Sequence, residues 1–172
     1  TTSHRKDCFQ DLKLVVPTEA ASGPAGVPSA LRALLTPERM TGDEQYQCDV
    51  CAKKTDATRG VQLRRLPAIL TLQLKRFRYE PRTGQRHKIS TSFDFPTRID
   101  MGEYVQGDDD DGSDPSLPYE LYAVLVHQGS ASFGHYYALI QDVARGEWFE
   151  FNDATVKPIK ASELKRAVGG EN

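Results

Sequence analysis

The stretch Gly134-His135-Tyr136-Tyr137-Ala138-Leu139-Ile140, followed after a short polar segment by Glu147-Trp148-Phe149-Glu150-Phe151-Asn152, decides how the C-terminal third of the chain folds. Both runs are rich in aromatic and branched residues, and Gln141 to Gly146 have the length and composition of a hairpin with a short loop. With Gln141 paired to Gly146, His135 lies opposite Asn152, with Cβ atoms about 5 Å apart. The sequence therefore predicts a hairpin that brings an imidazole beside a side-chain amide.

This His/Asn pair matches the base and the orienting group of a Cys-His-Asn catalytic site, because the amide oxygen can accept the ring N–H and fix the tautomer. The alternative is a surface histidine at a strand start beside an Asn-Asp turn. The loop Gly129-Ser130-Ala131-Ser132-Phe133-Gly134 favours the functional interpretation, since its glycines allow the backbone to approach closely just before the histidine.

Working outward, apolar spacing predicts the other elements. A first strand spans 9–16 and ends at Pro17, a helix spans 28–35 and ends at Pro37, and a period-two strand carries Leu70, Leu72 and Leu74. Residues 79–84 have turn composition, and 119–126, apolar on both faces, is predicted as one central strand. Asp108 to Asp111 form an acidic loop that is expected to be solvated, with a partner-facing role as the alternative.

Size and charge narrow the class of protein. With 172 residues and roughly 150 residues per domain, the chain is one domain or a large part of one. A net charge of -2 without a dense basic run argues against nucleic acid, and no apolar segment approaches the roughly 18 residues of a membrane span. Three cysteines are too few for a disulfide framework, which predicts a cytoplasmic and/or nuclear location. The chain opens at Thr1, which suggests a piece of a longer protein or a processed chain.

The sequence resembles the ubiquitin-specific proteases, the papain-like deubiquitinases, across nearly its whole length. The motifs that carry the resemblance occur in order: residues 8–14 (CFQDLKL), 45–51 (QYQCDVC), 66–77 (LPAILTLQLKRF), 88–101 with Phe95-Pro96 at the centre, 134–138 (GHYYA) and 148–156 (WFEFNDATV). The resemblance implies an α+β, papain-like cysteine peptidase fold with an antiparallel palm sheet and β-rich fingers. Residues 1–75 would form mainly the fingers and a connecting helix, and 76–172 mainly the palm.

The resemblance also assigns roles to individual residues. His135 is implied as general base, Asn152 as its orienting group and Asp153 as the next-best orienting group. The residues implied to hold the ubiquitin tail are Leu74, Phe77, His127 and Tyr136. For Leu74 and Phe77, the alternative to contact with the ubiquitin tail is plain packing in the core. Phe133 departs from the Gly-Gly-His of many relatives and could narrow the cleft.

The family's nucleophile lies in an N-terminal Asn-x-Gly-Asn-Thr-Cys box, and nothing like it occurs in these 172 residues. The expectation is therefore a partial catalytic domain whose thumb segment, carrying the catalytic Cys, is supplied from elsewhere. This chain alone should then be inactive.

Cys48 and Cys51 form a C-x-x-C pair, which is half of a structural tetrahedral zinc site. The family expects the other two thiolates just before Thr1. His4 and Cys8 could complete the site instead, and two buried free cysteines are a further alternative. Catalysis itself requires no cofactor.

Two functions follow from these features. The first is thiol-dependent hydrolysis of the (iso)peptide bond at the ubiquitin C-terminal glycine, with this chain supplying the His/Asn half of the site. The second is a catalytically inactive ubiquitin-binding or scaffolding module. The expected partners are ubiquitin, ubiquitinated proteins and the thumb segment, and neither nucleic acid nor membrane.

Overall fold

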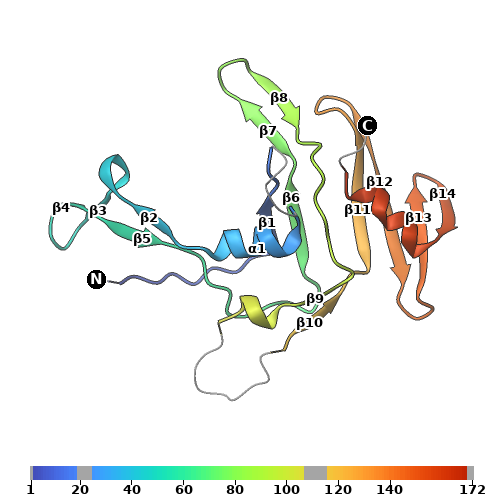
Figure 1. Cartoon of the computed structure of the whole chain (residues 1–172), viewed down its shortest axis with the longest axis horizontal. Coiled ribbons are helices and arrows are strands. Elements are labelled where there is room, and N and C mark those ends of the chain that lie inside the picture. Colours follow the sequence, from blue (N-terminus) through green and yellow to red (C-terminus); the bar gives the residue numbers. More distant parts are fainter. Residues whose placement is uncertain (1, 19–24, 107–115, 170–172) are drawn as a thin grey trace.

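A parallel pair of strands far apart in the sequence lies at the centre of the molecule (Figure 1). The computed structural model describes residues 2–18, 25–106 and 116–169. β1 (Asp11–Val15) runs beside β6 (Thr71–Lys75), with Leu14 opposite Leu74. Because side chains alternate along a strand, Leu12 and Leu14 point to one face and are buried, whereas Lys13 is exposed. The predicted first strand is confirmed.

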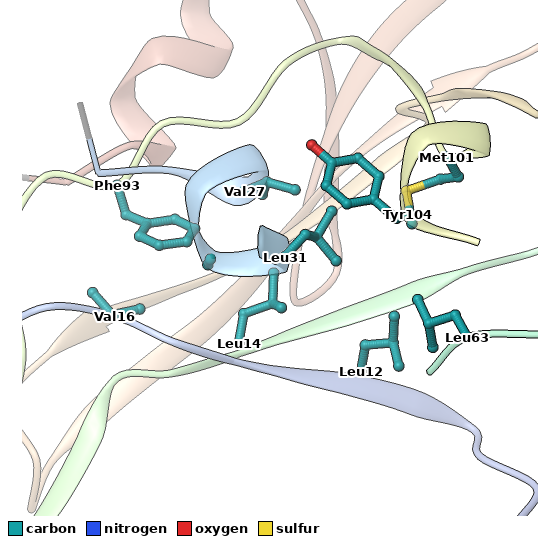
Figure 2. Packing of buried hydrophobic residues seen from close by; sticks show 10 residues of the cluster. Leu12, Leu14, Val16, Val27, Leu31, Leu63, Phe93, Met101 and Tyr104 are labelled. Carbon is teal, nitrogen blue, oxygen red and sulfur yellow. The ribbon is translucent and has the colours of Figure 1, made fainter. Parts of the chain in front are cut away.

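The helix α1 (Val27–Leu35) covers this buried face. Its apolar side presents Val27, Ala30 and Leu31 to the core, and Figure 2 shows Leu31 above Leu14. Leu12 of β1 and Val16 directly after it belong to the same core, and distant segments add Leu63, Phe93, Met101 and Tyr104. A fully buried Leu side chain contributes about 1.5–3 kcal/mol. The predicted helix at 28–35 is confirmed, and it stops before Pro37, which cannot continue it.

Between α1 and β6 the chain runs out into a narrow arm and returns (Figure 1). The arm consists of two antiparallel pairs: β2 (Glu38–Met40) with β5 (Ala57–Arg59), and β3 (Tyr46–Cys48) with β4 (Lys53–Thr55). A 3₁₀ turn, η1 (Gly42–Glu44), lies between β2 and β3. None of these strands carries a buried residue, so the arm is held by its backbone ladders and by polar contacts such as Arg59 Nη2 to Glu38 Oε2 at 2.9 Å.

The C-terminal third forms a four-stranded antiparallel sheet in the order β11-β12-β13-β14. Its strands are β11 (Ala123–Gly129), β12 (Gly134–Asp142), β13 (Glu147–Asn152) and β14 (Thr155–Ile159). The 3₁₀ segment η3 (Ala161–Ala167) packs Leu164 against Leu139 and Trp148, which gives this sheet a second small core. The predicted C-terminal antiparallel sheet is confirmed.

A buried carboxylate ties η3 to this sheet. Glu150 of β13 is only 6% exposed and forms ion pairs with Lys157 Nζ at 3.0 Å and with the Arg166 guanidinium. The hydrogen bond from Lys157 is the largest influence that lowers the pKa of Glu150, and the charge of Arg166 lowers it further. The carboxylate is therefore ionised at neutral pH and forms ion pairs with both Lys157 and Arg166.

The prediction of one central strand at 119–126 is wrong. Its first part is β10 (Pro118–Glu120), which pairs with β9 (Arg98–Asp100), and only the second part is β11. The chain changes partner at Leu121, whose N–H donates to Thr97 O, and at Tyr122, whose carbonyl accepts from Gln141 N. Among the described residues β11 lies at the end of the sheet order, and its outward residue Leu125 is 71% exposed.

A separate hairpin lies near the start of β12 (Figure 1). It consists of β7 (Phe77–Glu80) and β8 (Gln85–Lys88), and the turn predicted at 79–84 is confirmed as its connection. A 3₁₀ turn, η2 (Gly102–Tyr104), precedes the predicted acidic loop at Asp108–Asp111, which lies outside the described residues. No helix among the described residues is long and apolar enough to cross a membrane.

Candidate active site

His135 and Asn152 are in direct contact where β12 begins and β13 ends. His135 Nε2 lies 2.6 Å from Asn152 Oδ1. A carbonyl oxygen only accepts, so Nε2 donates the hydrogen bond, and in the neutral ring Nδ1 is then the nitrogen with a lone pair. The His135 side chain is 45% exposed. This leaves a proton acceptor with a fixed tautomer at the surface.

The predicted contact is present, but the predicted register is wrong. Gln141 pairs with Trp148 rather than with Gly146, and the β12–β13 ladder ends at Ala138 opposite Phe151. Asp142 causes the difference, because its Oδ1 accepts from the backbone N–H groups of residues 144 and 145 and so moves the turn to residues 143–146.

The shift moves every partner by two positions, and an even shift leaves each side chain on its original face. Asn152 therefore still lies on the His135 side of the sheet. The two side chains meet as diagonal neighbours beyond the end of the ladder rather than as a directly opposed pair.

Asp153 lies at the tip of the next hairpin, in the left-handed backbone region with φ 52°. Asp tolerates this conformation better than most residues do. Its Oδ2 is 3.9 Å from His135 Nε2, and its side chain is 82% exposed. At that distance it adds an electrostatic contact rather than a hydrogen bond, so Asn152 is the direct partner.

Three of the four residues predicted to hold the ubiquitin tail form one aromatic cluster. The His127 ring centroid lies 5.3 Å from that of Phe77, edge to face, and 4.6 Å from that of Tyr136. Desolvation is the larger influence that lowers the pKa of His127, and the nearby charge of Lys88 lowers it further. The His127 ring is therefore neutral at physiological pH. Its Nδ1 is buried and has no hydrogen-bond partner among the described residues.

This cluster lines a groove of about 520 Å³ between the β7–β8 hairpin and the β11–β12 loop. Arg78 and Arg86 line it from the hairpin, and the segment 130–134 from the loop. Gly134 and Tyr136 border the groove, so strand alternation directs His135 between them to the other face. The groove and the His/Asn pair thus adjoin the same end of β12.

Leu74 is not part of this groove. It points into the core formed by β1, β6 and α1, where it packs against the buried residues. Phe77 is 46% exposed and does line the groove. Leu74 is therefore a core-packing residue, whereas Phe77 is part of the groove.

Phe133 lies at the tip of the loop that leads into β12. This residue is 83% exposed and borders the groove. The backbone beneath it is well held, because Ser130 N donates to Phe133 O at 2.8 Å and Ser130 Oγ accepts from Phe133 N at 3.1 Å. A large apolar side chain is thus displayed on a firm turn beside the groove.

Cys48 and Cys51 lie together on the knuckle between β3 and β4, at the far end of the arm. Hydrogen bonds from Cys51, followed by the backbone N–H of Val50, lower the pKa of Cys48, and its contact with Cys48 raises the pKa of Cys51. Ala52 directly after the pair has φ 53°, which closes the knuckle tightly. Two thiols in this arrangement fit one half of a tetrahedral zinc site.

The described residues hold no group of three or more side chains that could bind a metal. His4 and Cys8 are among these residues, so the alternative in which they complete the Cys48/Cys51 site is not supported. Cys8 is exposed in the segment before β1. The alternative of two buried free cysteines is also wrong, because Cys51 is exposed and Cys48 only half-buried.

Sequence reasoning missed Lys88, which connects the β7–β8 hairpin to β11, the strand that precedes the loop at 130–133. Its Nζ donates to His127 O and to Gly129 O, both at 2.8 Å. Lys88 is one of 22 Lys and Arg residues, and its two acceptors are main-chain carbonyls about 40 residues further along the chain. No local pattern in the sequence marks such a contact.

A histidine at a strand start with an amide partner on the neighbouring strand is the arrangement found in peptidases with a Cys-His-Asn site. A model of the ubiquitin carboxyl-terminal hydrolase family matches residues 39–169. The chain belongs to the ubiquitin carboxyl-terminal hydrolase family.

Among similar proteins, human ubiquitin carboxyl-terminal hydrolase 47 is 32% identical over 221 residues, covering 98% of this chain and 16% of that protein. Arabidopsis thaliana ubiquitin carboxyl-terminal hydrolase 26 is 41% identical over 158 residues, covering 91% of this chain and 14% of that protein. The chain therefore spans about one sixth of the length of these relatives.

Solved structures agree with this membership. The chain matches the SAGA Ubp8/Sgf11/Sus1/Sgf73 DUB module bound to ubiquitin aldehyde with a TM-score of 0.76 and 30% identity, over 94% of this chain and 34% of that chain. A related SAGA DUB module bound to monoubiquitin matches with a TM-score of 0.74 and 29% identity over the same shares. The predicted α+β fold of the ubiquitin-specific protease type is thereby confirmed.

Proposed function

We propose that the chain supplies the His/Asn half of a deubiquitinase active site, which hydrolyses the (iso)peptide bond at the ubiquitin C-terminal glycine. The observation that carries the proposal is the 2.6 Å contact between His135 Nε2 and Asn152 Oδ1. In a member of this hydrolase family, such a contact leaves Nδ1 available as a proton acceptor at the surface.

The chemistry assigns one task to each side chain. His135 Nδ1 takes the proton of a cysteine thiol, and the resulting thiolate attacks the carbonyl carbon of the ubiquitin C-terminal glycine. The imidazolium then gives that proton to the leaving amine, which departs as the C–N bond breaks. Water, deprotonated by the same nitrogen, cleaves the thioester and releases the ubiquitin carboxylate and the thiol. Asn152 holds the ring in one tautomer throughout.

The nucleophile in this proposal comes from a segment outside these 172 residues. Cys48 and Cys51 are on the knuckle of the arm, and Cys8 lies in the segment before β1. None of the three lies in a sequence that resembles the family's cysteine box. We therefore assign the thiol to a thumb segment that contacts the palm near His135.

The groove beside β12 is proposed as the site of the ubiquitin tail, with Phe77, His127 and Tyr136 as its aromatic wall. This assignment is supported by the exposure of two of these residues, 46% for Phe77 and 55% for Tyr136, and by the position of the groove next to the strand of His135. Such rings offer apolar contact area to an extended peptide at little cost in conformational entropy.

Cys48 and Cys51 are proposed to hold a structural zinc together with two thiolates from outside the chain. The support is the knuckle geometry and the lowered pKa of Cys48, since a metal ligand must be a thiolate. Zinc there would stabilise the exposed arm and would take no part in the hydrolysis.

The test is hydrolysis of a fluorogenic ubiquitin C-terminal reporter by this chain alone and by the complete protein that carries a thumb segment. We expect no turnover by the chain alone and turnover by the complete protein, which His135→Ala abolishes while ubiquitin binding persists. Hydrolysis by the chain alone that disappears with Cys8→Ser, Cys48→Ser or Cys51→Ser would refute the external nucleophile. Ubiquitin binding without turnover in the complete protein would instead establish the inactive binding module.

A further inference from the structure

Lys88 joins two sheets that share no ladder hydrogen bonds among the described residues. It is the last residue of β8, and its Nζ donates to His127 O and Gly129 O at the end of β11, both at 2.8 Å. Burial, and secondarily the charge of Arg76, lower the pKa of Lys88. A partly buried ammonium thus donates to two main-chain carbonyls in place of water, and because the donor is ionised these hydrogen bonds are charge-assisted and stronger than neutral ones.

The carbonyl of Gly129 starts the turn that leads to the catalytic strand. Gly129 has φ 112°, a backbone region that other residues rarely adopt, and a Cβ at this position would lie 2.6 Å from Phe133 O. Ser130 then closes the loop by donating from its N–H to Phe133 O and by accepting from Phe133 N–H at its Oγ. Fixing the Gly129 carbonyl therefore fixes the path of the backbone as far as Phe133.

The His127 side chain also restricts the backbone just before His135, through its contact with Gly134. Its ring packs so closely on Gly134 that a Cβ at position 134 would overlap the imidazole. Phe77 and Tyr136 hold the ring from two sides, while Lys88 holds the His127 carbonyl. Gly134 is the residue immediately before His135, so the position of the His127 ring limits where β12 can begin.

We propose that Lys88 is a positioning residue for His135: its two bonds to the end of β11 set the loop and the strand start that place the catalytic imidazole. This inference rests on the proposed function of His135. It predicts that loss of Lys88 weakens the chemical step more than it weakens the binding of ubiquitin.

The experiment compares Lys88→Met, Lys88→Arg and, as a control, Lys165→Met in the complete protein. Met keeps most of the aliphatic stem without a donor, Arg keeps two donors that can reach two carbonyls, and Lys165 is exposed on η3. We expect Lys88→Met to lower kcat about tenfold with KM within about threefold of wild type, because charge-assisted hydrogen bonds are lost. Lys88→Arg should recover most of kcat, and Lys165→Met should match wild type.

Hydrogen–deuterium exchange of the segment 130–134 in the same proteins gives a readout that does not depend on turnover. Lys88→Met should accelerate exchange in this segment about tenfold, and Lys88→Arg should restore it. Unchanged kcat and unchanged exchange in Lys88→Met would overturn the inference, as would equal losses in Lys88→Met and Lys88→Arg. If the wild-type protein does not hydrolyse the reporter, the proposed function fails, and the exchange data alone then decide whether Lys88 holds the loop.

Discussion

Replacing Asn152 by Ala should lower kcat without abolishing it. The substitution removes the acceptor 2.6 Å from His135 Nε2, and a hydrogen bond at a side chain that is 45% exposed contributes about 1 kcal/mol net. That free energy corresponds to about a fivefold loss in the population of correctly oriented rings. Loss of the base itself in His135→Ala costs about 10²–10⁴-fold. The two variants should therefore differ by at least an order of magnitude.

Asp153 provides the internal control for this prediction. At 3.9 Å from His135 Nε2 and 82% exposed, its carboxylate should matter little while Asn152 is present, so Asp153→Ala should lose less than about threefold in kcat. If Asp153 takes over as orienting group in Asn152→Ala, the double variant should lose more than the product of the two single losses.

The pH profile separates orientation from charge. Asn152→Asp keeps an acceptor oxygen at the same position but adds a negative charge that favours the protonated ring. Its acid limb in kcat/KM should therefore move to higher pH, whereas the limb of Asn152→Ala should move little. The assay is steady-state reporter hydrolysis from pH 5 to 9 by the complete protein. An Asn152→Ala variant with the kcat of wild type, or with a greater loss than His135→Ala, would refute the assigned roles.

Glu150→Gln should lower the free energy of unfolding by about 2 kcal/mol, because it leaves Arg166 facing an uncharged group in a partly buried site. Since the folded-state pKa of Glu150 is depressed, this stabilisation is present above the carboxyl's unfolded pKa and is lost as pH falls through the folded pKa; denaturation of wild type and variant should converge in acid. Leu14→Ala, at a fully buried position, should cost about 2–5 kcal/mol in a urea titration. The complete domain should contain one zinc that Cys48→Ser or Cys51→Ser removes, and this chain alone should bind zinc weakly; one tightly held zinc in the chain alone would contradict the shared site.

Local patterns were sufficient to predict much of the fold. The alternation around Leu14 gave β1, apolar spacing and a flanking proline gave α1, and two aromatic runs around a polar loop gave the β12–β13 hairpin. The register of this hairpin depended on one side chain, Asp142, whose bonds to the turn amides compete with simple loop counting. The predicted register was wrong by two positions, and an even shift leaves Asn152 on the same face of the sheet as His135. The prediction of the His135/Asn152 contact therefore did not depend on the exact register.

The features that sequence could not supply are contacts between distant segments. The break at Leu121 arises because the Leu121 N–H donates to Thr97 O whereas Tyr122 O accepts from Gln141 N, and neither Thr97 nor Gln141 is close to Leu121 in the sequence. The hydrogen bond from Lys88 to the Gly129 carbonyl also joins distant segments. Because every residue has a carbonyl, the sequence does not mark which one Lys88 contacts. Aromatic residues that could belong to a core or to a groove, such as Phe77, are also decided by packing rather than by pattern.

The arm leaves the core and returns to it at the same place. Glu38 pairs with Arg59 at its base, both in the ladder and as a 2.9 Å ion pair, so residues 39–58 form an excursion whose two ends are already joined. Core residues lie before and after this excursion, which adds none of its own. Its length can therefore change with only a small cost in loop-closure entropy, which grows slowly with the number of residues. The arm is a part of this domain that could be shortened, extended or exchanged between relatives while β1, α1 and β6 keep their packing.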